Sequence, residues 1–157
     1  MKEIEISTLI KAKQYNELDA DEQRVVEAAQ RAVKGAYAPY SNFKVGAAIL
    51  LDNGEIALGA NQENAAFPSG TCAERTACYW AGANRPGAKF EMLAVYALGT
   101  DDEPCEQPAA PCGACRQALL EYEKLTGHDV PVLLAGRDVV YRLPSVKSLL
   151  PLAFTEF

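Results

Sequence analysis

The residue types best suited to metal chemistry fall in two short stretches, residues 71–75 and 111–116. The second stretch contains Cys112 and Cys115, and two cysteines three positions apart in the first turn of a helix lie on the same side, so both sulfurs can bind one ion. Because zinc prefers four tetrahedral ligands, two thiolates do not complete a site, and Cys72 in the first stretch is the natural third ligand. The spacing therefore predicts a zinc site made by these three cysteines.

Glu74 lies two positions after Cys72, and this spacing restricts where the pair can act. In mid-helix such side chains point apart, whereas at the start of a helix both can point past the end of the first turn. A carboxylate held beside a metal in this way can accept and return a proton. Arg75 directly follows Glu74 and Arg116 directly follows Cys115, and we expect both to donate to the sulfurs. Together with two helix N-termini, they offset the negative charge of three thiolates.

Simpler interpretations of the same residues stay open. Thr71 and Glu74 also fit a capping box, in which the glutamate only accepts the Thr71 N–H. Cys105 is a possible fourth ligand that would close the zinc site to chemistry, although it lies in a proline-flanked loop. Cys78 lies off the metal-facing side of its helix and is expected in the core. His128, the only histidine, is expected on the surface rather than as a ligand.

Hydrophobic periodicity and turn signals indicate the elements that must hold these residues. A helix should begin after Asp19, which forms a capping pair with Glu22, and Asn53-Gly54 between two apolar runs predicts a hairpin because glycine accepts positive φ. The predicted helices cover 20–34, 72–81, 113–125 and, more briefly, 145–150; the predicted strands cover 45–51, 55–60, 90–98, 130–135 and 139–143, with a short further strand suggested at Ile4 and Ile6. This order predicts helices packed on a mixed sheet.

Composition limits the classes of partner. The chain has 157 residues, enough for one domain with a sizeable core, and a net charge of −6 with a sequence pI of about 4.8. Because proteins that grip phosphate backbones need clustered Lys and Arg, this charge argues against nucleic acids and anionic membranes as partners. No apolar run reaches about 20 residues and no secretory signal opens the chain, so we expect a cytoplasmic protein. Five cysteines, an odd number, favour metal binding or catalysis over disulfides.

Taken together, the motifs resemble those of the small homotetrameric, zinc-dependent cytidine deaminases of the three-cysteine type. Cys72-Ala73-Glu74 and Pro111-Cys112-Gly113-Ala114-Cys115 match the zinc-deaminase signature with Cys in place of His. The matching stretches, spread over about residues 20–154, are 36–43, 45–48, 61–66, 72–75, 111–117, 149–151 and Phe154. The resemblance implies an α/β three-layer fold with a mixed five-stranded sheet packed between helices. It also implies one domain over residues 19–157, and residues 1–18 form an N-terminal extension beyond the usual start of the family.

The resemblance further implies an activity and a role for each matching residue. The reaction is hydrolytic deamination of cytidine and deoxycytidine to uridine and deoxyuridine in pyrimidine salvage, with zinc-bound hydroxide attacking C4 of the base. One Zn²⁺ per subunit binds to the three cysteines, and Glu74 shuttles protons. The implied substrate contacts are Asn61 and Glu63 to the ribose 3′-hydroxyl, Phe43 to the pyrimidine ring, the Ala73 N–H to the base carbonyl, and Phe154 to the site of a neighbouring subunit.

Besides the extension over residues 1–18, two further departures from the family and three rival functions accompany this interpretation. Phe67 stands where many relatives have Tyr, and the 99–111 loop is longer than expected, so the pocket entrance should differ. A deaminase of another cytosine nucleoside, such as a blasticidin-like antibiotic, shares the chemistry, but the Asn61 and Glu63 pair favours ordinary nucleosides. Polynucleotide editing is disfavoured by the acidic charge. A non-catalytic structural zinc module needs no role for Glu74.

Overall fold

The computed structural model describes residues 1–155 and is built on one six-stranded sheet. The strands are β1 (Lys11–Lys13), β2 (Lys44–Leu51), β3 (Ile56–Ala60), β4 (Phe90–Leu98), β5 (Val132–Ala135) and β6 (Val140–Leu143), in the spatial order β1-β6-β5-β4-β2-β3. Strands β4 and β5 run parallel, and the other neighbouring pairs run antiparallel. The sheet is therefore mixed, as predicted.

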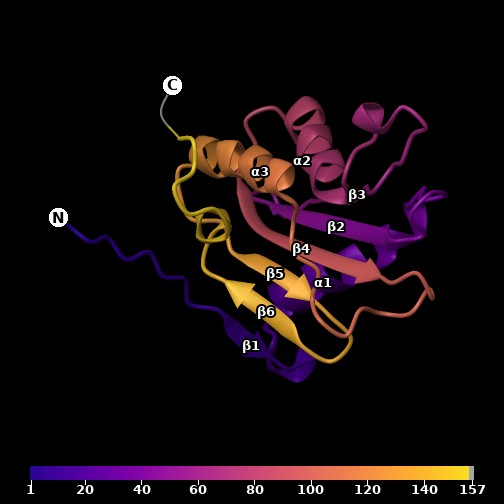
Figure 1. The fold of residues 1–157 in the computed structure, drawn as a ribbon, viewed down its shortest axis with the longest axis horizontal. Coiled ribbons are helices and arrows are strands. Elements are labelled where there is room, and N and C mark those ends of the chain that lie inside the picture. Colours follow the sequence, from indigo (N-terminus) through magenta and orange to yellow (C-terminus); the bar gives the residue numbers. More distant parts are fainter. Residues whose placement is uncertain (156–157) are drawn as a thin grey trace.

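Helices cover both faces of this sheet. Helix α1 (Ala20–Ala32) packs on one face, and α2 (Ala73–Asn84) and α3 (Gly113–Thr126) lie side by side on the other (Figure 1). Short 3-10 helices occupy Tyr15–Glu17, Val33–Gly35, Phe67–Ser69 and Val146–Leu149. The predicted three-layer α/β arrangement is thus confirmed. None of the helices in residues 1–155 combines the length and the apolar character needed to cross a membrane.

The central strands carry two separate hydrophobic cores. In β2, Ala47 and Ile49 pack in the cluster with α2, whereas Ala48 and Leu50 pack in the cluster with α1. Successive side chains of a strand point to opposite faces, so a strand covered on both sides needs apolar residues at nearly every position. This requirement explains the unbroken apolar run of β2, whose residues from Gly46 onward are all buried.

The sheet has one strand more than the five that were predicted. Strand β1 pairs antiparallel with β6, with Lys13 opposite Val140. The short strand suggested at Ile4 and Ile6 is wrong, because these residues are exposed in an extended segment that leaves the sheet toward the N-terminus (Figure 1). The alternation of isoleucine and glutamate there is typical of a strand, but pairing requires a neighbouring strand edge, which the chain reaches only at β1.

The remaining predicted elements are present, with their ends shifted by a few residues. The hairpin between β2 and β3 turns at Asn53-Gly54, and Gly54 has a φ of +83°, the left-handed conformation for which glycine was expected. The Gly54 N–H donates to the Leu51 carbonyl at 2.8 Å and closes the turn. The hairpin places β3 at the edge of the sheet.

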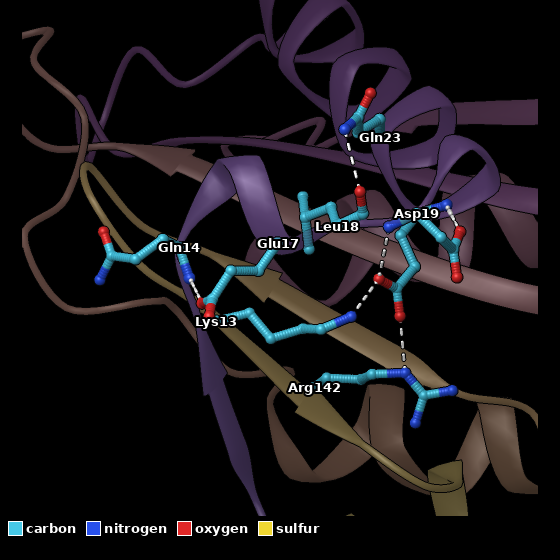
Figure 2. A network of polar contacts seen from close by, with 8 residues as sticks. Lys13, Gln14, Glu17, Leu18, Asp19, Gln23 and Arg142 are labelled. Atoms are coloured by element: carbon cyan, nitrogen blue, oxygen red, sulfur yellow. Dashed lines mark hydrogen bonds and ion pairs between the residues drawn. The ribbon is translucent and has the colours of Figure 1, made fainter.

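A buried carboxylate joins the N-terminal strand to the rest of the fold. Glu22, in the first turn of α1, is 1% exposed and binds both Lys13 of β1 and Arg142 of β6. It also accepts the Asp19 N–H, while the Asp19 side chain accepts the Glu22 N–H, so the predicted capping pair is a complete capping box. Figure 2 shows Lys13 and Arg142 reaching from their strands toward the turn at Asp19. Three elements are therefore joined at one side chain.

Two glycines allow helices to approach the sheet very closely. A Cβ on Gly59 of β3 would lie 2.3 Å from the Ala73 carbonyl oxygen and 2.5 Å from the Ala77 nitrogen of α2. A Cβ on Gly46 of β2 would lie 2.2 Å from the Ala29 carbonyl oxygen of α1, on the opposite face. Both distances are far inside van der Waals contact, so only glycine permits this packing. Gly59 thereby fixes the height of the first turn of α2 above the sheet.

Candidate metal centre and adjoining cavity

Two helix N-termini converge where the sequence places its cysteines. Cys72 is the N-cap residue of α2 and Cys112 is the N-cap residue of α3, and neither side chain caps its own helix. Cys115 lies in the first turn of α3 and is buried, whereas Cys112 is exposed and Cys72 is half-buried. The partial positive charges of both helix ends therefore face sulfurs, which stabilises thiolates over thiols.

The three sulfurs have the spacing that a tetrahedral zinc ion requires. Cys112 Sγ lies 3.7 Å from Cys72 Sγ and 3.5 Å from Cys115 Sγ, and all three atoms lie within 4.8 Å of one another. Zinc–sulfur bonds of about 2.3 Å at tetrahedral angles place two sulfurs about 3.8 Å apart. Among residues 1–155 this group contains no fourth ligand, so the closed site with Cys105 is not formed. The donor set fits zinc with one coordination position left to solvent or substrate.

Arg75 lies against this cluster as the sequence suggested. Its Nη2 donates to Cys72 Sγ at 3.7 Å, and its buried Nε has no hydrogen-bond partner among residues 1–155. The pKa of the Cys72 thiol is lowered to about 5, first by a hydrogen bond from Cys115 and then, against the effect of burial, by Arg75 and Cys112. A partly buried cation whose partner is a thiolate compensates the negative charge that zinc alone does not neutralise.

Glu74 occupies the first turn of α2 and is 3% exposed. Burial raises the pKa of its carboxyl group, and the negative charge on Cys72 adds to this effect. The capping-box alternative is wrong, because the Thr71 N–H donates to the Gln62 carbonyl at 2.9 Å instead of to Glu74. A carboxyl group whose pKa is raised beside a metal-binding cluster is suited to accept a proton and to return it.

Arg116 was expected to donate to the cysteine sulfurs, but the described residues show other partners for it. Its Nε donates to the Pro111 carbonyl at 2.8 Å and its Nη1 donates to the Leu149 carbonyl at 2.7 Å, so these groups are directed at backbone oxygens rather than at sulfur. The reason is tertiary: the 3-10 helix Val146–Leu149 lies within reach of the guanidinium group and offers unpaired carbonyls. Arg116 therefore ties the residue before Cys112 to the C-terminal segment.

The other titratable residues considered as ligands lie elsewhere. Cys78 is fully buried in the core, and burial raises the pKa of its thiol to about 12, so it is inert at neutral pH. Cys105 lies in the 99–111 loop, where its backbone bonds Ala97 and Arg137. His128 is partly exposed and lies 3.3 Å from Glu91. These placements agree with the predictions that Cys78 lies in the core, that Cys105 is a loop residue outside the metal site, and that His128 lies on the surface.

A cavity of about 500 Å³ opens beside the cluster. Residues that line it include Cys72 and Arg75 from the metal centre and Asn61 and Glu63 from the loop after β3, and the others are Tyr40, Ser41, Gln62, Asn64, Phe67, Gly70 and Thr71. The ring of Phe67 packs edge-on against Tyr40, with centroids 5.7 Å apart. A cavity of this volume, with polar groups and aromatic rings in its lining, accommodates a small ligand that has both polar groups and a flat ring.

Asn61 and Glu63 are both held by hydrogen bonds to the backbone. Asn61 Oδ1 accepts the Val45 N–H at 2.8 Å, and its Nδ2 donates to the Phe43 carbonyl at 2.9 Å. The Glu63 carboxylate accepts the N–H groups of Tyr40 and Ser41 and the Ser41 hydroxyl. These bonds hold the pKa of Glu63 below its usual value, with the Ser41 hydroxyl contributing most, so the group is an anion at neutral pH.

The remaining predicted substrate residues lie outside the lining of this cavity. Phe43 is partly exposed and adjoins it through the Asn61 contact, and Ala73 is fully buried at the first helical position of α2. Phe154 is 66% exposed, and its carbonyl accepts the Gln117 amide beside α3. Within one subunit, therefore, the structure brings Asn61 and Glu63 to the cavity with Cys72 but does not bring Phe154 there.

Sequence reasoning did not single out Tyr40, Ser41 or Phe67 as parts of one wall. Tyr40 and Ser41 lie in a matched stretch, residues 36–43, but no spacing rule connects them to Glu63 more than twenty positions later. The connection is made by the bridge between Tyr37 and Gln62, which places the two loops side by side. Only the folded chain shows this proximity.

Comparisons with known proteins agree with the geometry. The family model described as the cytidine and deoxycytidylate deaminase zinc-binding region matches residues 19–126. A cytidine deaminase of Halalkalibacterium halodurans is 38% identical over 135 residues, which cover 86% of this chain and 95% of the relative. This chain belongs to the cytidine deaminase family.

Two solved cytidine deaminases have the same fold. The Burkholderia pseudomallei enzyme is 43% identical, with a TM-score of 0.70 over 83% of this chain and 97% of that chain. The Mycobacterium tuberculosis enzyme is 32% identical, with a TM-score of 0.67 over 88% of this chain and 100% of that chain. As a member of the cytidine deaminase family, the protein is a zinc-dependent hydrolase, and the family's zinc-binding region includes both cysteine motifs. The thiol cluster is a site for one Zn²⁺ per subunit.

Proposed function

We propose that this protein deaminates cytidine and deoxycytidine by hydrolysis, giving uridine, deoxyuridine and ammonia. The observation that carries the proposal is the buried carboxyl group of Glu74 beside three clustered sulfurs, one of which, that of Cys72, belongs to the lining of a cavity of about 500 Å³. Membership of the cytidine deaminase family supports the same reaction. In this proposal Cys72, Cys112 and Cys115 are the zinc ligands.

When bound, the zinc ion supplies the Lewis acidity that makes water a nucleophile near neutral pH. Glu74 accepts a proton from the water that attacks C4 of the base and delivers it to N3. It then takes the proton of the hydroxyl group added at C4 and delivers it to the amino group, so that the C4 carbonyl forms and the amine leaves as ammonia. One carboxyl group serves as base and then as acid, and its raised pKa suits both steps. Arg75 keeps the thiolates compensated while the charge on Glu74 changes.

The substrate orientation follows from the placement of the polar groups. Glu63 is an anion that faces the cavity, and with Asn61 it binds the ribose 3′-hydroxyl. Phe43 packs on the pyrimidine ring, and the Ala73 N–H, at the N-terminus of α2, donates to the base carbonyl. Phe154 completes the site of a neighbouring subunit, which is supported by its exposed position away from the cavity of its own chain.

We place this activity in pyrimidine salvage in the cytoplasm, in a homotetramer that binds neither nucleic acid nor membranes. Three free thiols within 4.8 Å of one another are best kept in a reducing compartment, which supports the cytoplasmic location. The net charge of −6 supports a small-molecule substrate over a polynucleotide. The start of the family match at residue 19 supports a deaminase domain over 19–157 and an extension over 1–18.

The test is an ultraviolet and ammonia-release assay on cytidine, run beside zinc quantification for each protein. Glu74→Gln should lower kcat by about 10²- to 10⁴-fold or more while zinc content and melting temperature stay unchanged. The exposed Glu27→Gln on α1 serves as the matched control and should keep full activity. Wild-type protein with full zinc that releases no ammonia from cytidine would refute the proposal. Activity on a blasticidin-like nucleoside alone would reassign the substrate, and zinc without any activity would indicate a structural module.

A further inference from the structure

One hydroxyl group joins two parts of the cavity that are separate in the sequence. Ser41 Oγ donates to Glu63 Oε1 and accepts the Phe43 N–H at 3.1 Å. The same carboxylate accepts the Tyr40 N–H at 2.8 Å and the Ser41 N–H at 3.2 Å, both on Oε2. Through these bonds the loop before β2 is fastened to the loop after β3 at a single carboxylate.

The bond from Phe43 decides the direction of the Ser41 hydroxyl. A serine hydroxyl has one hydrogen and can rotate to several partners. Because the Phe43 N–H already occupies an acceptor position on Oγ, the hydroxyl hydrogen points away from that group and toward Glu63 Oε1. Asn42 between them has a φ of +54°, so the backbone is held in a tight left-handed turn that brings the two groups together.

The hydrogen-bond donors around the Glu63 carboxylate leave one of its acceptor positions open. A carboxylate offers about four acceptor positions, two on each oxygen. The two N–H groups occupy Oε2 and the Ser41 hydroxyl occupies one position on Oε1, so one position on Oε1 is left for a further donor in the cavity. Without Ser41, Oε1 would have no donor of its own and the carboxylate plane could turn about its terminal bond.

We propose that Ser41 is a positioning residue that aims Glu63 Oε1 at a single sugar hydroxyl of the substrate. This inference rests on the proposed function and adds to it a residue that does not touch the base or the reacting atoms. Ser41 acts on substrate binding and leaves the chemical step to Glu74 and the zinc ligands. Loss of the hydroxyl should therefore raise KM and leave kcat nearly unchanged.

The experiment compares Ser41→Ala with Ser41→Thr, which keeps the hydroxyl, on cytidine and on 3′-deoxycytidine. Since hydrogen bonds to charged groups are worth more than neutral ones and two N–H donors remain, we expect KM for cytidine to rise about tenfold in Ser41→Ala. Ser41→Thr should restore most of the affinity. On 3′-deoxycytidine, which lacks the hydroxyl, wild type and Ser41→Ala should have the same KM. Ser7→Ala, at an exposed serine that does not line the cavity, is the matched control.

A second measurement places the effect on Glu63. In a Glu63→Ala background, Ser41→Ala should cause no further rise in KM, because a residue that acts only through the carboxylate has nothing left to position. Equal penalties on both substrates, additive effects of the two substitutions, or a fall in kcat as large as the rise in KM would overturn the inference. The proposed function would survive any of these results, provided that the wild-type protein deaminates cytidine. A wild-type protein without that activity would refute both.

Discussion

Replacement of Gly59 by alanine tests whether the height of α2 above the sheet sets the geometry of the metal centre. Gly59 lies on β3 directly beneath the first turn of α2, which holds Ala73 between Cys72 and Glu74. The added Cβ would lie 2.3 Å from the Ala73 carbonyl oxygen and 2.5 Å from the Ala77 nitrogen. Both neighbours are backbone atoms, so no side chain can rotate away to relieve the contact.

The magnitude follows from these distances. A Cβ normally stays about 3.4 Å or more from such atoms, so the helix must move away from β3 by roughly 1 Å. Overpacking of this kind costs about 1–3 kcal/mol of folding free energy. A displacement of about 1 Å at the reacting groups lowers turnover by about 10²-fold. Because Cys72 and Glu74 move with the helix while Cys112 and Cys115 stay on α3, zinc affinity should fall as well.

Gly46→Ala is the control for this experiment, because it creates the same clash on the other face of the sheet. Its Cβ would lie 2.2 Å from the Ala29 carbonyl oxygen and 2.5 Å from the Val33 nitrogen, against α1 and away from the metal centre. Urea unfolding, kcat on cytidine and zinc content should be measured for both variants. We expect similar losses of stability, with the large loss of turnover confined to Gly59→Ala.

Two results would refute this reasoning. Equal losses of kcat in the two variants would mean that turnover follows overall stability rather than the position of α2. Full activity and full zinc content in Gly59→Ala would mean that the first turn of the helix adapts without moving its side chains.

Two further predictions concern charged groups. Burial raises the pKa of Glu22, but bonds from Lys13, the Asp19 N–H and Arg142 outweigh it and hold the pKa below its usual value. Its contribution to stability is therefore complete above about pH 4.3 and is lost as the pH falls through the lower folded-state pKa. In urea unfolding, Glu22→Gln should cost about 2 kcal/mol at pH 7, the worth of a hydrogen bond to a charged group. Wild type and variant should converge in acid, and a constant difference at all pH values would contradict the assignment. Arg75→Ala should slow turnover while zinc is retained, and unchanged turnover in a zinc-loaded protein would remove its role in charge compensation.

Local signals were sufficient for the elements other than β1 and for the metal ligands. The Asp19 and Glu22 pair, the Asn53-Gly54 turn and the cysteine motifs each depend on residues a few positions apart, so chain geometry alone predicts their conformation. Cys72 and Cys112 are forty positions apart, so local signals do not connect them. Their proximity was predicted from the preference of zinc for four ligands, which Cys112 and Cys115 alone do not satisfy.

The sequence by itself determined which residues can bind zinc and move a proton, because these abilities belong to residue types and short spacings. The tertiary structure alone decided what lies next to them. It directed the Nε and Nη1 of Arg116 to backbone carbonyls, added β1 to the sheet through Glu22, and placed Ser41 against Glu63. These contacts join segments that are distant along the chain, and their partners are fixed only when the two cores pack on the sheet.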